Sequence, residues 1–223
     1  MEKGKSKVAV VGGKGNMGRR YRAILRLLNV EHYVIDIGTD RQIDPKTTGI
    51  IISTPTETHY NMLKEFGAYN IPILIEKPIC KDLNQLEDIL DFTKTNLRMI
   101  NQYEYWFKDK PEVKIRAWLG EAGKGNKKCS TYYNYYHSGV DGMLWDCINI
   151  IGLDSSEKIT LGQNLPTWEC WINGEKIPRE EMDDAYIWNI EDWLEKLDDN
   201  RKYILMAHRK VGALEERYKT CKI

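Results

Sequence analysis

The sequence predicts an α/β protein with two domains: a doubly wound parallel sheet in the N-terminal half and a small α+β domain with a mostly antiparallel sheet after it. Up to about residue 108, short apolar runs alternate with segments whose apolar residues recur at helical spacing, the pattern of a parallel sheet covered by helices. Beyond about residue 110, strand-like segments rich in aromatic and β-branched residues follow one another without a regular helix between each pair. We therefore place the domains at residues 1–108 and 109–223.

Apolar runs define the strands of the parallel sheet. The expected strands are residues 8–12, 32–37, 49–53, 71–76 and 97–101. Helices are expected after the first strand, from a cap near Thr56, and from a capping box of Asp82 and Gln85. Their buried faces follow from helical spacing and comprise Tyr21, Ile24, Leu25 and Leu28; His59, Met62, Leu63 and Phe66; and Leu83, Leu86 and Leu90.

The second domain has a different pattern. Strands are expected at residues 113–120, 127–136 and 165–174, with one helix at about 142–151. Two helices are predicted to close the chain, from about Asp184 and about Lys202, and the last is expected to pack back on the first domain. Their inward residues are predicted to be Ile187, Ile190, Leu194 and Leu197, then Ala207, Val211, Leu214 and Tyr218.

The composition argues against a nucleic-acid-binding, zinc-binding, disulfide-rich or membrane-spanning protein. Lysine plus arginine and aspartate plus glutamate both total 33, so no net field favours nucleic acid or an anionic membrane. The five cysteines are scattered and never form C-x-x-C, which indicates neither a zinc site nor a disulfide framework. The N-terminus lacks an apolar signal region, and no run approaches the ~18 apolar residues of a membrane span. We expect a cytoplasmic protein that binds no metal, nucleic acid or membrane.

A glycine-rich turn follows the first strand. The spacing Gly13-x-Gly15-x-x-Gly18 lies directly after a strand and opens a helix, the context in which this pattern indicates a dinucleotide site. We assign Gly13 to the tight turn, Gly15 to close approach of a pyrophosphate, and Gly18 to the contact between helix and strand. Asn16 and Met17 lie at the helix start, where backbone N–H groups meet negative charge. The alternative is a glycine turn without a ligand.

Asp36 indicates which dinucleotide binds. An acid at the end of the second strand is placed to accept both ribose hydroxyls of the adenosine half, and it would repel a 2′-phosphate. NAD is therefore favoured over NADP, although Lys14 and Arg41 could soften that preference. The alternative role for Asp36 is to cap a turn.

Polar segments end the next two strands. The segment STPTETH follows the third strand at residues 53–59, and LIEKPIC, residues 74–80, ends the fourth. Ligands of a doubly wound sheet bind outside the carboxyl ends of its strands. Ser53, Thr54 and Thr56 are therefore expected to face a cofactor rather than solvent.

In this order, the glycine loop, Asp36, TPTETH and EKP resemble the Gfo/Idh/MocA family of NAD(P)-dependent oxidoreductases, typified by glucose-fructose oxidoreductase and inositol dehydrogenase. The resemblance is specific through about Gln102, and the chain looks like a short and divergent member. It implies an N-terminal Rossmann domain and a Lys77–Pro78 peptide in the cis form. Beyond the glycine loop and Asp36, the cofactor contacts it implies are Ser53, Thr54, Pro55, Thr56, His59, Glu76, Lys77 and Gln102.

Lys77 is the residue to which the resemblance gives a catalytic role. It implies that Lys77 lies beside the nicotinamide and the reacting hydroxyl, where a lysine can hydrogen-bond the substrate oxygen and help relay its proton. The alternative is that Glu76 and Lys77 form a salt bridge at the end of a strand.

One family position departs from the pattern. Members commonly carry an aspartate and, four residues later, a histidine on a helix entering the second domain; here Asp146 matches the aspartate, but Ile150 stands four residues on. Isoleucine can neither donate nor accept a proton. Three alternatives follow. Another group, such as His137, Tyr136 or Asn149, takes over the proton transfer; or the proton leaves through Lys77 and water alone; or hydride transfer is lost.

The leading hypothesis is an NAD-dependent oxidoreductase acting on a secondary alcohol or carbonyl of a sugar, cyclitol or sugar derivative, with Lys77, Asp146 and His137 as candidate catalytic residues. The rival is a catalytically silent NAD-binding sensor or regulator. The second domain also carries aromatic side chains suited to a sugar site, a homo-oligomer interface or packing behind its sheet: Tyr132, Tyr133, Tyr135, Tyr136, Trp168 and Trp171.

Overall fold

The computed structural model describes residues 6–39, 41–80, 83–100, 159–164, 167–172, 175–176, 178–205 and 208. The chain divides into two compact units. The first unit comprises Met1–Ile100 and Tyr186–Ile204, and the second comprises Asn101–Ala185 and Leu205–Ile223. In the described part of the chain, no helix is long and apolar enough to span a membrane.

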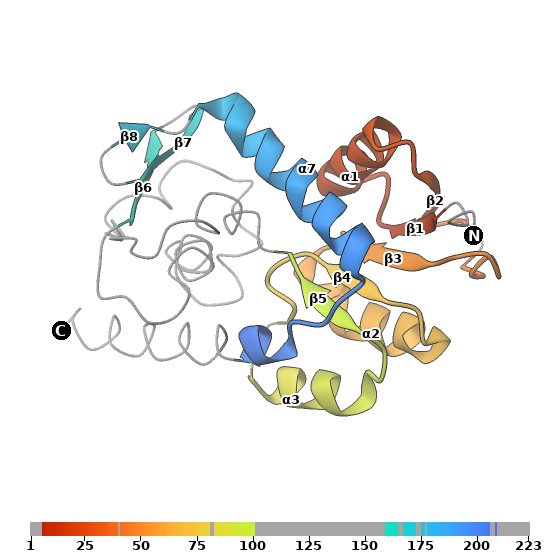
Figure 1. The fold of residues 1–223 in the computed structure, drawn as a ribbon. Coiled ribbons are helices and arrows are strands. Elements are labelled where there is room, and N and C mark those ends of the chain that lie inside the picture. Colours follow the sequence, from red (N-terminus) through yellow and green to blue (C-terminus); the bar gives the residue numbers. More distant parts are fainter. Residues whose placement is uncertain are drawn as a thin grey trace. The chain divides into compact units, whose positions relative to one another are not determined.

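A five-stranded parallel sheet forms the centre of the first unit (Figure 1). Its strands are β1 (Lys7–Val11), β2 (Glu31–Ile35), β3 (Gly49–Ile52), β4 (Ile73–Ile75) and β5 (Leu97–Met99). Their order is β2-β1-β3-β4-β5, and every neighbouring pair is parallel. The predicted α/β sheet is therefore confirmed. The chain reverses its direction of winding between β1 and β3, where ligands of doubly wound sheets bind.

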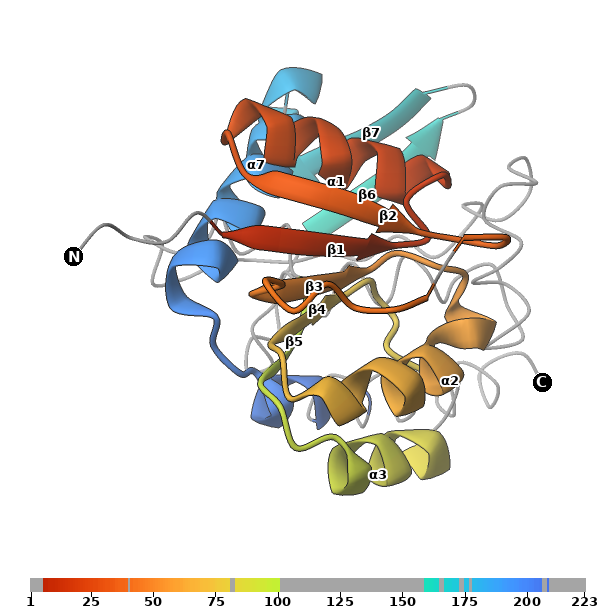
Figure 2. The same cartoon turned by 90° about the vertical axis from the view of Figure 1, so that its right-hand side faces the viewer.

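Helices cover both faces of this sheet. Helices α1 (Asn16–Leu27) and α7 (Arg179–Lys196) lie on one face, and α2 (Thr56–Phe66) and α3 (Leu83–Phe92) lie on the other (Figure 2). A short 3₁₀ turn, η1 (Gly67–Tyr69), follows α2. The central strands read as continuous apolar runs because both of their faces are buried.

Helix α7, from the C-terminal part of the chain, covers the face of the sheet beside α1. Between β2 and β3, the described residues 36–39 and 41–48 contain no helix. The apolar surface next to α1 is instead covered by Ile190 and Trp193 of α7, which pack with the inward residues of α1 and with β1. A Cβ on Gly49 would lie 2.7 Å from the Trp193 ring, so the glycine makes room for the indole.

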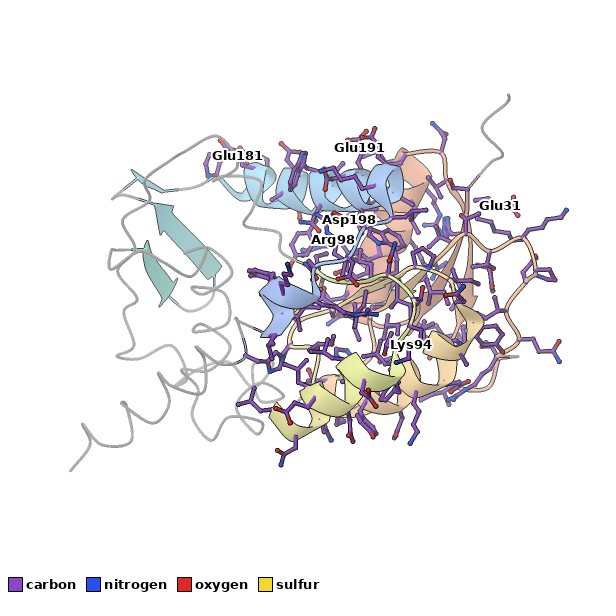
Figure 3. The ribbon with its side chains drawn as sticks, turned by 60° about the horizontal axis from the view of Figure 1, so that its bottom comes forward. Glu31, Lys94, Arg98, Glu181, Glu191 and Asp198 are labelled. Carbon is purple, nitrogen blue, oxygen red and sulfur yellow. The ribbon has the colours of Figure 1, made fainter. Side chains whose placement is uncertain are left out.

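The segment after α7 closes the open edge of the sheet. The side-chain amide of Asn200 donates to Met99 O at 3.0 Å and accepts from Met99 N at 2.9 Å, as a neighbouring strand would. The buried guanidinium of Arg98 contacts Asp192 at 2.8 Å and Asp198 at 2.9 Å. Figure 3 shows Arg98 and Asp198 side by side in this region.

Several local predictions need correction. Helical spacing predicts Leu83 inside, but Leu83 is exposed at the first residue of α3, and Leu86 and Ile89 form the buried face. The cap predicted near Thr56 is Pro55, the residue directly before α2. Asp82, the expected cap of α3, lies outside the described residues.

The two helices predicted to close the chain also differ in detail from the structure. Helix α7 begins at Arg179, five residues before the predicted start at Asp184, and Trp193 is fully buried whereas Leu194 is partly buried. A helical turn at 201–205 begins close to the predicted start at Lys202.

In the second unit, an antiparallel sheet joins β6 (Ile159–Asn164), β7 (Thr167–Ile172) and β8 (Glu175–Lys176) in that order. The strands predicted at 113–120 and 127–136 and the helix predicted at 142–151 lie outside the described residues. The mostly antiparallel character of the whole second domain therefore stays a prediction.

Candidate functional site

The turn between β1 and α1 is held by glycines, each for its own steric reason. The spacing predicts Gly13 as the residue of the tight turn, but the residue with positive φ is Gly12, at +80°. A Cβ on Gly13 would lie 2.8 Å from both methyl groups of Val34, so this glycine permits contact with β2. A Cβ on Gly18 would lie 2.2 Å from Gly12 O, in agreement with the predicted close contact of helix and strand.

The start of α1 is suited to an anion. Gly15 is the N-cap and donates its N–H to Gly12 O at 3.0 Å, and the helix has neither a side-chain cap nor an acidic residue in its first turn. Asn16 and Met17 form that first turn. The first N–H groups of a helix have no intrahelical acceptor and, with the helix dipole, favour negative charge. Gly15 has no backbone or side-chain atom nearer than 3.3 Å to an added Cβ, so its outer side is open.

Asp36 lies directly after β2 and beside the glycine loop. Its Oδ2 accepts the backbone N–H of Lys14 at 2.8 Å, and its Oδ1 accepts that of Ile37 at 2.8 Å. Asp36 therefore performs the capping role that was its alternative assignment. Each carboxylate oxygen can accept a further hydrogen bond, so this role leaves acceptors for two ribose hydroxyls.

A groove of about 260 Å³ lies between the ends of these strands, on the first unit alone. It is lined by Gly12 and Gly15 of the glycine loop, by Asp36 after β2, and by Ser53 and Thr54 after β3. The remaining walls are mostly apolar and consist of Val11, Ile35, Ile37, Arg41, Pro55, Thr58, Met62 and Phe66. The sequence did not single out Ile37, Met62 or Phe66 as wall residues; Ile37 is 88% exposed, which only the folded chain reveals.

The segment after β3 is fixed mainly by its own hydroxyls. Ser53 Oγ donates to Val11 O at 2.9 Å, so the serine hydroxyl ties β3 to β1. Thr58 Oγ1 lies 2.7 Å from both Thr54 Oγ1 and Pro55 O. Thr56 is buried at the start of α2. The groove walls thus include Ser53, Thr54 and Pro55 but not Thr56.

His59 joins the loops that follow β3 and β4. Its imidazole is fully buried, with Nε2 2.8 Å from Thr54 O and Nδ1 2.9 Å from Pro78 O. Burial lowers the pKa of His59, although the two carbonyls oppose the effect. A neutral imidazole has one N–H and donates to one of these carbonyls. His59 therefore connects the TPTETH segment to the corner that carries Lys77.

The Glu76–Lys77 corner is buried at the end of β4. Both side chains are less than a tenth exposed, and the Lys77–Pro78 peptide is cis, as the resemblance implied. The Tyr21 hydroxyl donates to Glu76 Oε1, and Lys77 N–H donates to Oε2 at 3.1 Å. Burial raises the pKa of Glu76, while the charge of Lys77 and the hydrogen bond from Tyr21 act in the opposite direction.

Tyr21 is a site residue that the sequence pattern does not reveal. Its spacing predicted an apolar position on the inner face of α1, and the ring is indeed buried. The signal that could have found its role is the hydroxyl, because a buried phenol needs a hydrogen-bond partner. Through it, the helix that follows the glycine loop is bonded to the residue before Lys77.

The structure thus brings the predicted residues of the first unit to one edge of the sheet, where β1, β2, β3 and β4 end. Gly15 leaves space beside the helix start that a side chain would fill, and Asp36 lines the same groove, so these residues fit a dinucleotide. Gln102, His137 and Asp146 lie outside the described residues, as do Tyr136, Asn149 and Ile150. Their roles stay predictions.

Comparison with known proteins agrees with this arrangement. Residues 38–103 match the GFO_IDH_MocA family, described as an oxidoreductase family with an NAD-binding Rossmann fold. A Gfo/Idh/MocA family oxidoreductase from Vibrio cholerae is similar over 96% of this chain and 98% of its own, with a TM-score of 0.65 and 10% identity. No curated protein has a significant sequence match.

Two further solved structures have the same fold. The WlbA (WbpB) dehydrogenase from Thermus thermophilus, in complex with NAD and UDP-GlcNAcA, matches over 94% of both chains with a TM-score of 0.61 and 10% identity. Biliverdin reductase from Synechocystis sp. PCC 6803, in complex with biliverdin and NADP⁺, matches over 96% of this chain and 98% of its own, with a TM-score of 0.57 and 11% identity. At such identities the likeness concerns the fold.

Proposed function

We propose that this chain, a member of the Gfo/Idh/MocA oxidoreductase family through its NAD-binding Rossmann domain, is an NAD-dependent dehydrogenase acting on a secondary alcohol or carbonyl of a sugar, cyclitol or sugar derivative. The observation that carries the proposal is the buried Lys77 at the end of β4, on the same sheet edge as the glycine loop and Asp36. A lysine buried there for stability alone would be costly, because charged groups lose hydration on burial.

The dinucleotide half of the proposal assigns three roles to the first unit. The N–H groups at the start of α1 bind the pyrophosphate, and Gly15 allows it to approach. Asp36 accepts the ribose hydroxyls while it continues to hold the Lys14 N–H. The acid disfavours a 2′-phosphate, so NAD is preferred to NADP. The TPTETH segment, from Thr54 to His59, then lies on the nicotinamide side.

The chemical half of the proposal assigns Lys77 to the substrate oxygen. NAD, when bound, supplies the hydride acceptor or its reduced form the donor. Lys77 binds the reacting hydroxyl or carbonyl and holds the proton that moves when the carbon is oxidised or reduced. Glu76 positions the lysine through its backbone, since Glu76 Oε2 accepts the Lys77 N–H. Asp146 and His137 are proposed as further proton carriers.

The substrate class rests on family resemblance together with one relative. The Thermus dehydrogenase was crystallised with NAD and UDP-GlcNAcA, a nucleotide sugar, which makes sugar derivatives the first compounds to test. The biliverdin reductase of the same fold shows why they need testing, because a shared fold hosts unrelated substrates.

A second candidate function is a silent NAD-binding sensor. The observation that favours it is Ile150, which stands where the family commonly has a histidine four residues after Asp146. Without that proton carrier the chain could retain the cofactor site and lose hydride transfer.

Turnover assays separate the two candidates. Purified chain is incubated with NAD and a panel of sugars, cyclitols and nucleotide sugars, and NADH formation is followed by absorbance. A dehydrogenase gives turnover with at least one compound, and Lys77→Met abolishes it whereas Lys64→Met, which removes an exposed lysine of α2, does not. NADH binding without turnover on the panel, in either direction, would favour the sensor. Full activity of Lys77→Met would give the lysine a structural role.

A further inference from the structure

The groove beside Asp36 contains a cation that the proposed function does not use. Among the described residues that line this groove, Arg41 is the one basic side chain. Its Nη1 lies 2.8 Å from Glu65 Oε2, and the two side chains are 52% and 34% exposed. The arginine comes from the connection after β2, and the glutamate comes from the last turn of α2.

An arginine at this place has a clear chemical meaning. In Rossmann sites that accept NADP, an arginine near the acid position pairs with the 2′-phosphate of the adenosine ribose. That phosphate carries close to two negative charges and forms bidentate hydrogen bonds with a guanidinium. Here the arginine is present on the groove wall, but its guanidinium is already paired with a carboxylate.

The position of Glu65 is not left to a flexible loop. Its helix is anchored by Leu63 and Phe66, which are fully buried, and Met62 and Phe66 of the same turn line the groove. The backbone of Glu65 is therefore fixed relative to the groove wall, and its side chain reaches Arg41. Asp36 and Arg41 line the groove, and Glu65, which is not a wall residue, pairs with the guanidinium of Arg41.

We infer that the Arg41–Glu65 pair is a coenzyme-selectivity element: Glu65 withholds Arg41 from a 2′-phosphate, so that the chain discriminates against NADP by pairing its own arginine as well as by repulsion from Asp36. The inference rests on the proposed dinucleotide site and adds to it the residues that set its preference. Glu65 acts through Arg41 and touches no part of the cofactor itself.

The test measures dissociation constants of NADH and NADPH by fluorescence titration of the full chain. Glu65→Gln keeps the size of the side chain and removes its charge. We expect it to tighten NADPH binding by about fivefold, the scale of a half-exposed ion pair, and to change NADH binding by less than about twofold. Arg41→Gln in the Glu65→Gln background should return NADPH binding to the wild-type value. Arg41→Gln alone should change NADPH binding by less than about twofold, because the arginine is already withheld.

A matched control removes the general effect of charge. Glu87→Gln deletes an exposed carboxylate on α3, away from the groove walls, and should leave the ratio of the two dissociation constants unchanged. The inference is overturned if Glu65→Gln leaves the NADPH to NADH ratio as it is, or if the double variant keeps the gain. Absence of NADH binding by the wild-type chain would refute the proposed function as well, which distinguishes the two failures.

Discussion

Gly18→Ala tests the steric reasoning about the glycine loop in the most direct way. The added Cβ would lie 2.2 Å from Gly12 O and 2.6 Å from Gly13 Cα. Both neighbours are backbone atoms, so no flexible side chain can move aside, and α1 must shift away from β1. Overpacking of this kind costs about 1–3 kcal/mol, and we expect the upper end here. That is a large part of the ~5–15 kcal/mol that stabilises a typical fold.

Two matched glycines separate steric strain from loss of function. Gly67 has φ of −63°, and its added Cβ would meet Thr93 Cγ2 at 3.6 Å, an ordinary contact, so Gly67→Ala should leave the stability within ~1 kcal/mol of wild type. Gly15→Ala would place its Cβ 3.3 Å from Gly12 O, which the loop can relieve by a small shift. We expect Gly15→Ala to fold but to weaken NADH binding, because the methyl group occupies the approach of the pyrophosphate.

Urea unfolding followed by circular dichroism gives the stabilities, and NADH fluorescence titration gives the binding. The steric account predicts a low urea midpoint for Gly18→Ala, a normal midpoint with weak binding for Gly15→Ala, and normal values of both for Gly67→Ala. A Gly18→Ala protein with the wild-type midpoint would refute it. So would a loss in Gly67→Ala as large as that in Gly18→Ala.

Three further outcomes are expected. Trp193→Ala should destabilise the fold by about 3–5 kcal/mol in urea unfolding, because the indole is fully buried against Gly49; an effect below ~1 kcal/mol would mean that α7 contributes little there. Tyr21→Phe leaves Glu76 without its hydroxyl donor in the core and should cost ~1–2 kcal/mol by the same assay, with an unchanged midpoint as the contrary result. Burial lowers the pKa of His59 below its ordinary value of 6.5, so below that pH the unfolded chain takes up a proton that the folded chain does not. The stability contributed by the neutral histidine should therefore be full above about pH 6.5 and fall below it. His59→Gln should reduce the fall in urea midpoint between about pH 7.5 and about pH 5.5.

The parts of the site that the sequence predicted are those set by local patterns. The glycine spacing, the acid after β2 and the EKP corner each follow an apolar run, and parallel strands bring their carboxyl ends to one edge. The exact task of each glycine was less predictable. Gly12, which carries the positive φ, lies outside the motif spacing, and Gly13 is required because Val34 packs against it.

What the sequence could not predict depends on contacts between distant segments. The Trp193 contact with Gly49 and the pairing of Asn200 with Met99 join residues from opposite ends of the chain. The bond from Tyr21 to Glu76 is hidden because a tyrosine on a helical stripe fits the core pattern as well as a polar role does. Spacing alone predicts Leu83 inside, but the first turn of a helix need not lie over the sheet, and Leu83 is exposed.

Calorimetric titration of the full chain with NADH tests the central claim, that the edge formed by the glycine loop and Asp36 is a dinucleotide site. We predict one NADH bound per chain, with Asp36→Ala binding about tenfold more weakly or worse, since hydrogen bonds to a charged group contribute ~1.5–3 kcal/mol. Asp36→Asn, which keeps one acceptor oxygen for the Lys14 N–H, should bind with intermediate affinity. No binding heat with either NADH or NADPH, or equal affinity for NADH in wild type and Asp36→Ala, would contradict the account.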